Sequence, residues 1–227
     1  MSLHYNGLFC VLMIVQPVVA DTTIRLMIAA EVQPSACQLL LDNSGVVNFG
    51  QYALERLNSD APSLLGSRDI NLHIQCESPR QVAWSIIDER ADTLDHSLSF
   101  SGVISDSGQR IVAADSLYGL GLSRTGRPLG AYRVEARFAH AQVDGQHVSW
   151  SWITAQKAGQ HWQGTGGDMF TQPGRQWFTP THHNQPLAFS RATVPLRVMA
   201  IIAPGQMLAS GDITWLAGKA TITLTYL

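Results

Sequence analysis

The stretch GKATITLTYL at residues 218–227 decides the fold class, because apolar and polar side chains alternate along its length. One face carries Ala220, Ile222, Leu224 and Tyr226. Alternation with period two is typical of a half-buried β-strand, and the intervening threonines suit a pleated backbone. An apolar strand that continues to Leu227 predicts that something docks against it. The alternative is an ordinary last strand packed within its own sheet.

Similar short segments recur along the chain and are separated by turn residues, which is typical of an antiparallel β-sandwich. We expect strands at 24–28, 38–41, 46–49, 70–76, 82–86, 132–138, 148–152 and 194–200. Residues 157–184 are rich in Gly, Gln, Thr and Pro and predict long loops, and the nearest helical candidate is a turn or two at 52–57. The sequence therefore predicts an all-β fold with one sandwich domain over 33–227.

Residues 1–20 are expected to be a secretory signal peptide, although no Lys or Arg precedes its apolar core. That core, at 8–15, is followed by Pro17 and by a small-residue cleavage site at 18–20. It is too short to span a bilayer. We therefore expect export, with a mature chain that begins at Asp21.

Removal of the signal peptide would leave two cysteines, Cys37 and Cys76. A lone pair in an exported chain is most simply one disulfide, and the chain-entropy model gives roughly 4 kcal/mol for a loop of about 40 residues. Two free thiols are the alternative. A zinc site would need further ligands that the neighbouring sequence does not offer.

The composition excludes several classes of partner. Charged residues are 14% of the chain and the formal net charge is −2, which favours neither nucleic-acid binding nor electrostatic docking to a membrane. Hydrophobic residues make up 45%, enough for a packed core rather than a disordered chain.

Few residues suggest chemistry, and we predict no enzyme, no metal site and no cofactor. His182 and His183, with His161 upstream, lack a carboxylate at a spacing that would converge on a metal. The glycine-rich 164–167 lacks the Lys-Ser/Thr of a phosphate loop. Aromatic faces suit sugars, so a carbohydrate platform is an alternative to core packing for a set of tryptophans: Trp150, Trp152, Trp162 and Trp177.

Several motifs resemble known proteins. The spacing of Cys37 and Cys76, the Phe49-Gly50 pair and the penultimate Tyr226 look like pilin subunits of the chaperone–usher pathway. More specifically, the chain resembles the fimbrial-like DUF1120 group of Gram-negative bacteria through PSAC at 34–37, VNFG at 47–50, YGLG at 118–121, GAY at 130–132 and ATITLTYL at 220–227.

This resemblance implies an immunoglobulin-like sandwich that is incomplete, because its final strand is missing and leaves an apolar groove beside the C-terminal strand. A periplasmic chaperone would lend a strand, and the N-terminal extension of the next subunit would replace it at the outer-membrane usher. The donor would be 21–32, with Ile24, Leu26, Ile28 and Ala30 filling pockets. The acceptor and chaperone-binding strand would comprise Ala220, Ile222, Leu224, Tyr226 and Leu227. The alternative for 21–32 is the self-paired first strand of a closed sandwich.

The expected function is that of a fimbrial (pilus) subunit that passes through the periplasm, joins other pilus subunits at the cell surface and contributes to adhesion. Its partners would be the chaperone, the usher and those subunits. The alternative is a self-contained periplasmic binding or regulatory protein linked to nitrogen metabolism.

Overall fold

The computed structural model describes residues 36–96, 114–154, 161–208 and 216–227. The chain divides into a unit Met1–Pro34 and a unit Ser35–Leu227, and every described residue belongs to the second. The predicted signal peptide at 1–20 and donor segment at 21–32, with Ile24, Leu26, Ile28 and Ala30, lie outside the described residues. Within the described residues no helix has the length and apolar character needed to cross a membrane.

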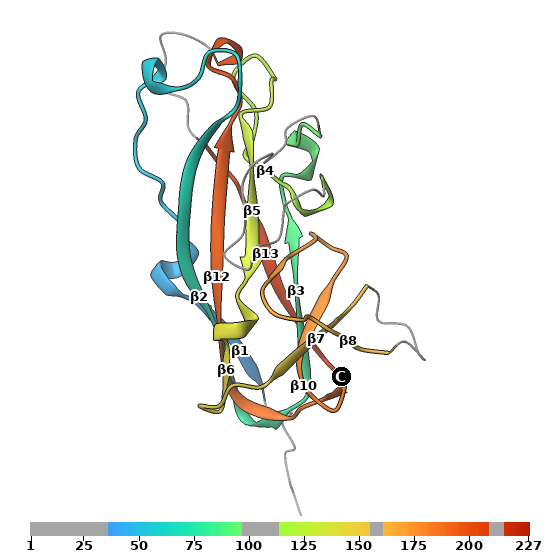
Figure 1. Cartoon of the computed structure of the whole chain (residues 1–227). Helices are drawn as coiled ribbons and strands as arrows, with labels where there is room; N and C mark the ends of the chain where they lie inside the picture. The colour runs from blue at the N-terminus through green and yellow to red at the C-terminus, as the bar shows by residue number, and fades with distance from the viewer. Residues whose placement is uncertain (1–35, 97–113, 155–160, 209–215) are drawn as a thin grey trace, which may run out of the picture. The chain divides into compact units, whose positions relative to one another are not determined.

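Two antiparallel sheets form the described part of the chain (Figure 1). The first sheet has the order β1 (Cys37–Leu41), β2 (Ser63–Arg80), β12 (Phe189–Ile202), β5 (Gly130–Ala136), β4 (Tyr118–Gly119), with β6 (Gln142–Val143) on β12 and β9 (Met169–Phe170) on β5. The second has the order β13 (Ala220–Tyr226), β3 (Val82–Asp88), β10 (Trp177–His182), β7 (Ser149–Ile153), β8 (Gln163–Gly164), with β11 (Gln185–Pro186) on β10.

The described residues contain short 3-10 turns and no α-helix. The turns are η1 (Asp42–Gly45), η2 (Leu54–Arg56), η3 (Ala91–Thr93), η4 (Ala114–Ser116), η5 (Phe138–His140) and η6 (Gly205–Met207). The predicted all-β antiparallel sandwich is confirmed.

One hydrophobic core joins the two sheets, and alternate strand residues build it. The first sheet contributes Leu72 and Val194, both fully buried, and the second contributes Trp84 and Phe178, whose ring centroids are 4.8 Å apart. The period-two pattern of the sequence therefore reflects packing between the sheets.

The expected strand at 46–49 is wrong. The backbone N–H of Gly50 donates to Asn48 Oδ1 at 2.7 Å, and Gly50 has a φ of 87°. A side-chain hydrogen bond of this local kind competes with ladder pairing. Val46 is accordingly 65% exposed rather than packed in a sheet.

The expectation of long loops at 157–184 is wrong for β10, which lies in the middle of the second sheet between β3 and β7. Its threonines are buried and hydrogen-bonded: Thr179 Oγ1 donates to Val82 O at 2.8 Å, and the hydroxyls of Thr181 and Ser151 are 2.8 Å apart. Because burial on both faces removes the alternation in hydropathy, the strand carries no period-two signal.

Candidate strand-binding edge

Strand β13 forms one edge of the second sheet, and β3 is its only partner among the described strands. The ladder continues past both of its ends, where Leu227 N–H donates to Gln81 O and Glu89 N–H donates to Lys219 O, each at 3.0 Å. Odd-numbered residues of β13 therefore occupy the hydrogen-bonded pairs. The N–H and C=O groups of the even-numbered residues point away from β3, toward the unpaired side.

The side chains of these even-numbered residues face the sandwich core. Ala220, Ile222 and Leu224 pack against the core but are only half-buried, whereas Trp84 and Ile86 on neighbouring β3 are 1% and 3% exposed. The apolar side chains of β13 are therefore less buried than those of its neighbour β3. The predicted acceptor residues therefore combine, on one strand, main-chain groups that no described strand pairs and apolar side chains that are partly exposed.

Strand β1 repeats this arrangement at the edge of the first sheet. Glu77 N–H donates to Ala36 O at 3.3 Å, which places even-numbered residues in the hydrogen-bonded pairs with β2. Cys37, Leu39 and Leu41 therefore direct their main-chain groups away from β2. All three side chains are half-buried and contact the same core as β13.

The two edges meet at Tyr226. Cys37 N–H, which is directed away from β2, donates to the Tyr226 hydroxyl at 2.8 Å. We call the unpaired sides of β1 and β13, with their half-buried side chains, the open seam; its apolar members are Leu39, Leu41, Ala220, Ile222 and Leu224.

The disulfide predicted from the cysteine pair is confirmed, since Cys37 and Cys76 are bonded, with their Cα atoms 4.0 Å apart. They face each other in the register of β1 and β2, at a pair that is not hydrogen-bonded, where side chains approach closely. The free-thiol and zinc alternatives are excluded. The bond holds β1 on β2 at the end where Tyr226 reaches across the seam.

Sequence reasoning missed a polar anchor at the other end of β1. Asp42 follows the strand, and its Oδ1 lies 2.8 Å from His73 Nε2 while its Oδ2 accepts from Asn71 Nδ2 at 2.8 Å. The hydrogen bond with His73 is the main cause that holds the pKa of the Asp42 carboxyl below its usual range, and the hydrogen bonds from Asn71 act in the same direction. Both partners lie about thirty residues along the chain, so no local motif announces them.

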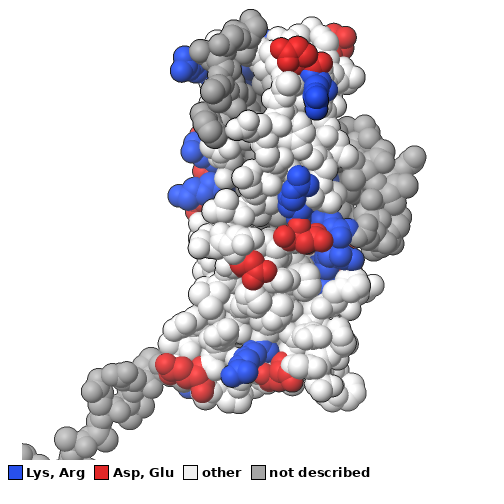
Figure 2. Space-filling view, turned by 90° about the vertical axis from the view of Figure 1, so that its left-hand side faces the viewer, with Lys and Arg blue, Asp and Glu red and all other residues white. Residues whose placement is uncertain are grey.

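Other candidate chemistry does not converge. The rings of His182 and His183 lie 4.0 Å apart, and the described residues contain no group of three side chains suited to a metal ion. Figure 2 shows charges of both signs in small groups on a largely uncharged face. That face therefore offers an electrostatic partner no extended patch of one sign.

Comparisons with known proteins agree with the resemblance to the DUF1120 group. Residues 26–133 match the family model described as "Protein of unknown function (DUF1120)". Over 220 residues the chain is 29% identical to "Uncharacterized protein YhcF" of Escherichia coli (strain K12), covering 86% of this chain and 87% of that protein. It is 24% identical over 229 residues to "Protein GltF" of the same organism, covering 91% and 89%. Residues 26–133, which contain both cysteines and β1 to β3, therefore carry the sequence pattern of the DUF1120 family.

Proposed function

We propose that this protein is an exported subunit of a surface fibre and that it is assembled by strand exchange at the open seam. One observation carries the proposal: Ala220, Ile222 and Leu224 have main-chain groups that no described strand pairs, and their apolar side chains face the core but are only half-buried. An incoming strand could form hydrogen bonds with these main-chain groups and cover these side chains. Addition of a strand to a free sheet edge uses both kinds of contact.

The energies favour a stable complex. Each main-chain hydrogen bond contributes about 1 kcal/mol net. Each apolar side chain that becomes fully buried adds about 1.5–3 kcal/mol. A slip of one residue would turn the apolar side chains of the incoming strand away from the core, so the alternation fixes the register as well as the affinity.

The proposed partners follow from this mechanism. Residues 21–32 of a second copy are the proposed donor, with Ile24, Leu26 and Ile28 directed into the seam. A periplasmic chaperone covers the seam before assembly, and its basic residues bind the carboxylate of Leu227. At the outer-membrane usher, the donor strand of the next subunit replaces the chaperone. The assembled fibre contributes to surface adhesion.

The test is co-expression, in the periplasm, of the full chain with a chaperone of this class from the same genome. We expect ladders of multimers that persist in mild SDS. Replacement of Ile24, Leu26 and Ile28 together by serine should leave only the chaperone-bound monomer. The matched control, serine at Thr23 and Arg25 on the opposite face of the donor, should keep the ladder.

A chain that is monomeric, soluble and cooperatively folded without a chaperone would contradict the proposal. That result would favour the self-contained periplasmic binding or regulatory protein. Loss of the ladder in both serine variants would also count against an alternating donor strand.

A further inference from the structure

Glu135 carries a buried carboxyl on the outer face of the first sheet. Its neighbours on β5, Val134 and Ala136, belong to the core between the sheets, and alternation along the strand directs Glu135 to the other face. The residue is 1% exposed, and neither carboxyl oxygen has a hydrogen-bond partner in the part of the chain that the structure describes. An ionised carboxylate at this position is destabilised, because burial removes water and supplies nothing in its place.

Strand β9 covers this carboxyl from the edge of the sheet, since Phe170 faces Glu135 in the register of β5 and β9. Thr171 N–H donates to Val134 O at 2.9 Å, so the adjoining pair of the ladder is hydrogen-bonded. The pair of Glu135 and Phe170 is therefore not hydrogen-bonded, and its side chains approach closely. Phe170 also packs against an apolar cluster formed by Leu117, Ala131, Met199 and Ile201.

Charged side chains from several elements lie near Glu135. They come from β2, β12, β5 and the residues that flank β5 and β9: Asp69, Arg197, Arg133, Arg137 and Asp168. Arg197 lies opposite Glu135 on β12, but its guanidinium donates to the two carboxylate oxygens of Asp69 at 2.8 and 3.2 Å. The cation nearest in the register is therefore matched by a different carboxylate.

The other two arginines are also engaged. Arg137 Nε lies 3.5 Å from Asp168 Oδ2, and Arg137 Nη2 lies 3.0 Å from Nε2 of His140. Arg133 Cζ lies 5.1 Å from the centroid of the Phe170 ring. Within the described residues, none of these side chains hydrogen-bonds to the buried carboxyl.

These surroundings favour the protonated form of Glu135. Burial is the main cause that raises the pKa of its carboxyl above the ordinary value of 4.5; Asp168 raises it further, Arg137 lowers it and Asp69 raises it. A group whose pKa is raised by folding stabilises the folded arrangement fully below the ordinary value. That contribution is lost as the pH rises through the raised value.

Residues 168–171, which we call the strap, contain β9 and are held differently at their two ends. Thr171 is fully buried, its hydroxyl donates to Val134 O at 3.0 Å, and that hydroxyl lies 2.6 Å from the hydroxyl of Tyr118. At the other end, Asp168 Oδ1 accepts from Ala139 N–H at 3.0 Å. The bonds at Thr171 are buried, so the strap is more firmly fixed there.

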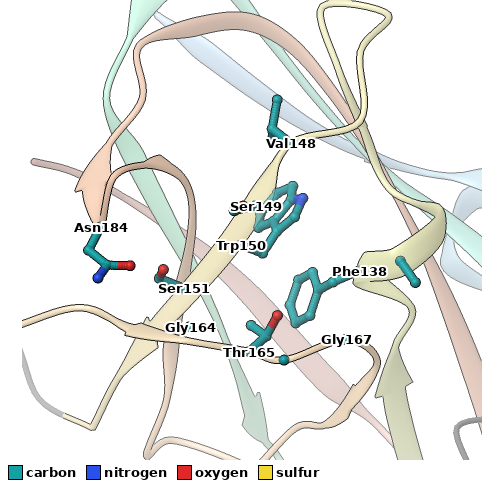
Figure 3. Close-up of a pocket in the computed structure, with 11 residues that line it drawn as sticks. Phe138, Val148, Ser149, Trp150, Ser151, Gly164, Thr165, Gly167 and Asn184 are labelled. Carbon is teal, nitrogen blue, oxygen red and sulfur yellow. The ribbon is translucent and has the colours of Figure 1, made fainter.

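Two glycines and a cavity adjoin the Asp168 end of the strap. Gly166 and Gly167 have φ values of 69° and 131°, and a Cβ atom on either would meet open space. Both glycines line a cavity of about 340 Å³ together with Phe138, and Figure 3 shows the segment from Gly164 to Gly167 passing beside the Phe138 ring. The start of the strap therefore has backbone freedom and space to move.

We propose that the strap is a pH-sensitive cover of β5, which lies on the strand while Glu135 is protonated and swings away at its Asp168 end when Glu135 ionises. Release gives the carboxylate access to water and breaks the hydrogen-bonded pair of Ala136 and Met169. This part of β5 then becomes a free strand edge, on the opposite side of the first sheet from β1. The inference does not rest on strand exchange at the open seam.

The test measures amide hydrogen exchange by NMR between pH 4.5 and pH 8 on the full chain, with its chaperone where solubility requires it. The protection of the Met169 amide is divided by that of Val194, which lies in the ladder of β2 and β12 and reports global unfolding. We expect this ratio to fall at least about tenfold as the pH rises, the effect of one unit of difference in pKa. Glu135→Gln keeps the shape of the side chain without its charge and should hold the ratio at its acid value.

Glu77→Gln is the matched control, because Glu77 is exposed on β2, outside this group of charges. This variant should keep the pH dependence of the unaltered chain. A ¹³C titration of the Glu135 carboxyl needs no variant, and its midpoint should lie above 4.5. The proposal is overturned by a midpoint at or below that value, by a ratio in the unaltered chain that does not change with pH, by an unchanged pH dependence in Glu135→Gln, or by loss of that dependence in Glu77→Gln.

Discussion

The backbone N–H of Cys37 donates a hydrogen bond to the Tyr226 hydroxyl at 2.8 Å and so joins the free edges of the two sheets. The N–H involved is one that β2 does not use. The tyrosine hydroxyl therefore occupies a position on β1 that the carbonyl of an added strand would otherwise take. Tyr226 is 52% exposed, which leaves its ring free to move aside.

Tyr226→Phe should release this N–H. We expect faster hydrogen exchange at the Cys37 amide and a loss of about 0.5–1.5 kcal/mol in the free energy of unfolding, the net effect of one hydrogen bond. An added strand should also enter more quickly, since it no longer competes with the tyrosine. Exchange measured by NMR, with the kinetics of uptake of a 21–32 peptide, checks both effects.

Tyr52→Phe is the matched control. Its hydroxyl donates to Leu65 O at 2.9 Å, and the ring is 41% exposed. This variant should lose a similar free energy without changing exchange at Cys37. Equal exchange at Cys37 in Tyr226→Phe and in the unaltered chain would show that the 2.8 Å contact does not protect this amide.

The double replacement Cys37→Ser and Cys76→Ser should lower the free energy of unfolding by roughly 4 kcal/mol, because the bond closes a loop of 39 residues in the unfolded chain. Denaturant unfolding of the oxidised, reduced and serine forms measures the difference. Reduced protein and the serine variant should agree closely. A serine variant as stable as the oxidised chain would mean that strand pairing alone holds β1.

Sequence reasoning predicted β13 from the local alternation at 220–226. It predicted the disulfide because only two cysteines remain once the expected signal peptide is set aside. The bond between Cys37 and Tyr226 spans 189 residues and depends on how the two sheets stack. Strand β10 escaped prediction because Thr179 and Thr181 are buried in it and hydrogen-bond to the neighbouring strands β3 and β7, so polar and apolar residues do not alternate along its length.

Ile222→Ser should weaken the binding of an added strand, because this side chain faces the seam. A loss of about 1.5–3 kcal/mol in the free energy of binding is expected for one apolar side chain. Thr223→Ser lies one residue further along, exposed on the outer face, and should bind as the unaltered chain does. Competition between the 21–32 peptide and the chaperone measures both, and equal loss in the two variants would contradict the assigned face.

Asp42→Asn should change the dependence of stability on pH. The pKa of Asp42 is lowered in the folded chain by its hydrogen bonds, chiefly that from His73, relative to an ordinary value of 3.8. The ionised carboxylate therefore stabilises the folded state above that value, and the contribution is lost as the pH falls through the lower folded pKa.

Urea unfolding between pH 6 and pH 2.5 measures this effect, and the unaltered chain should lose more stability over the acid part of the range than Asp42→Asn does. Asp60→Asn, which removes an exposed carboxyl that does not contact His73, should retain the acid slope. Because Asp42 anchors the end of β1, its protonation should also speed hydrogen exchange at Leu40, whose main chain pairs with β2 opposite His73. Identical acid slopes in Asp42→Asn and the unaltered chain would show that this anchor does not couple pH to the stability of the edge.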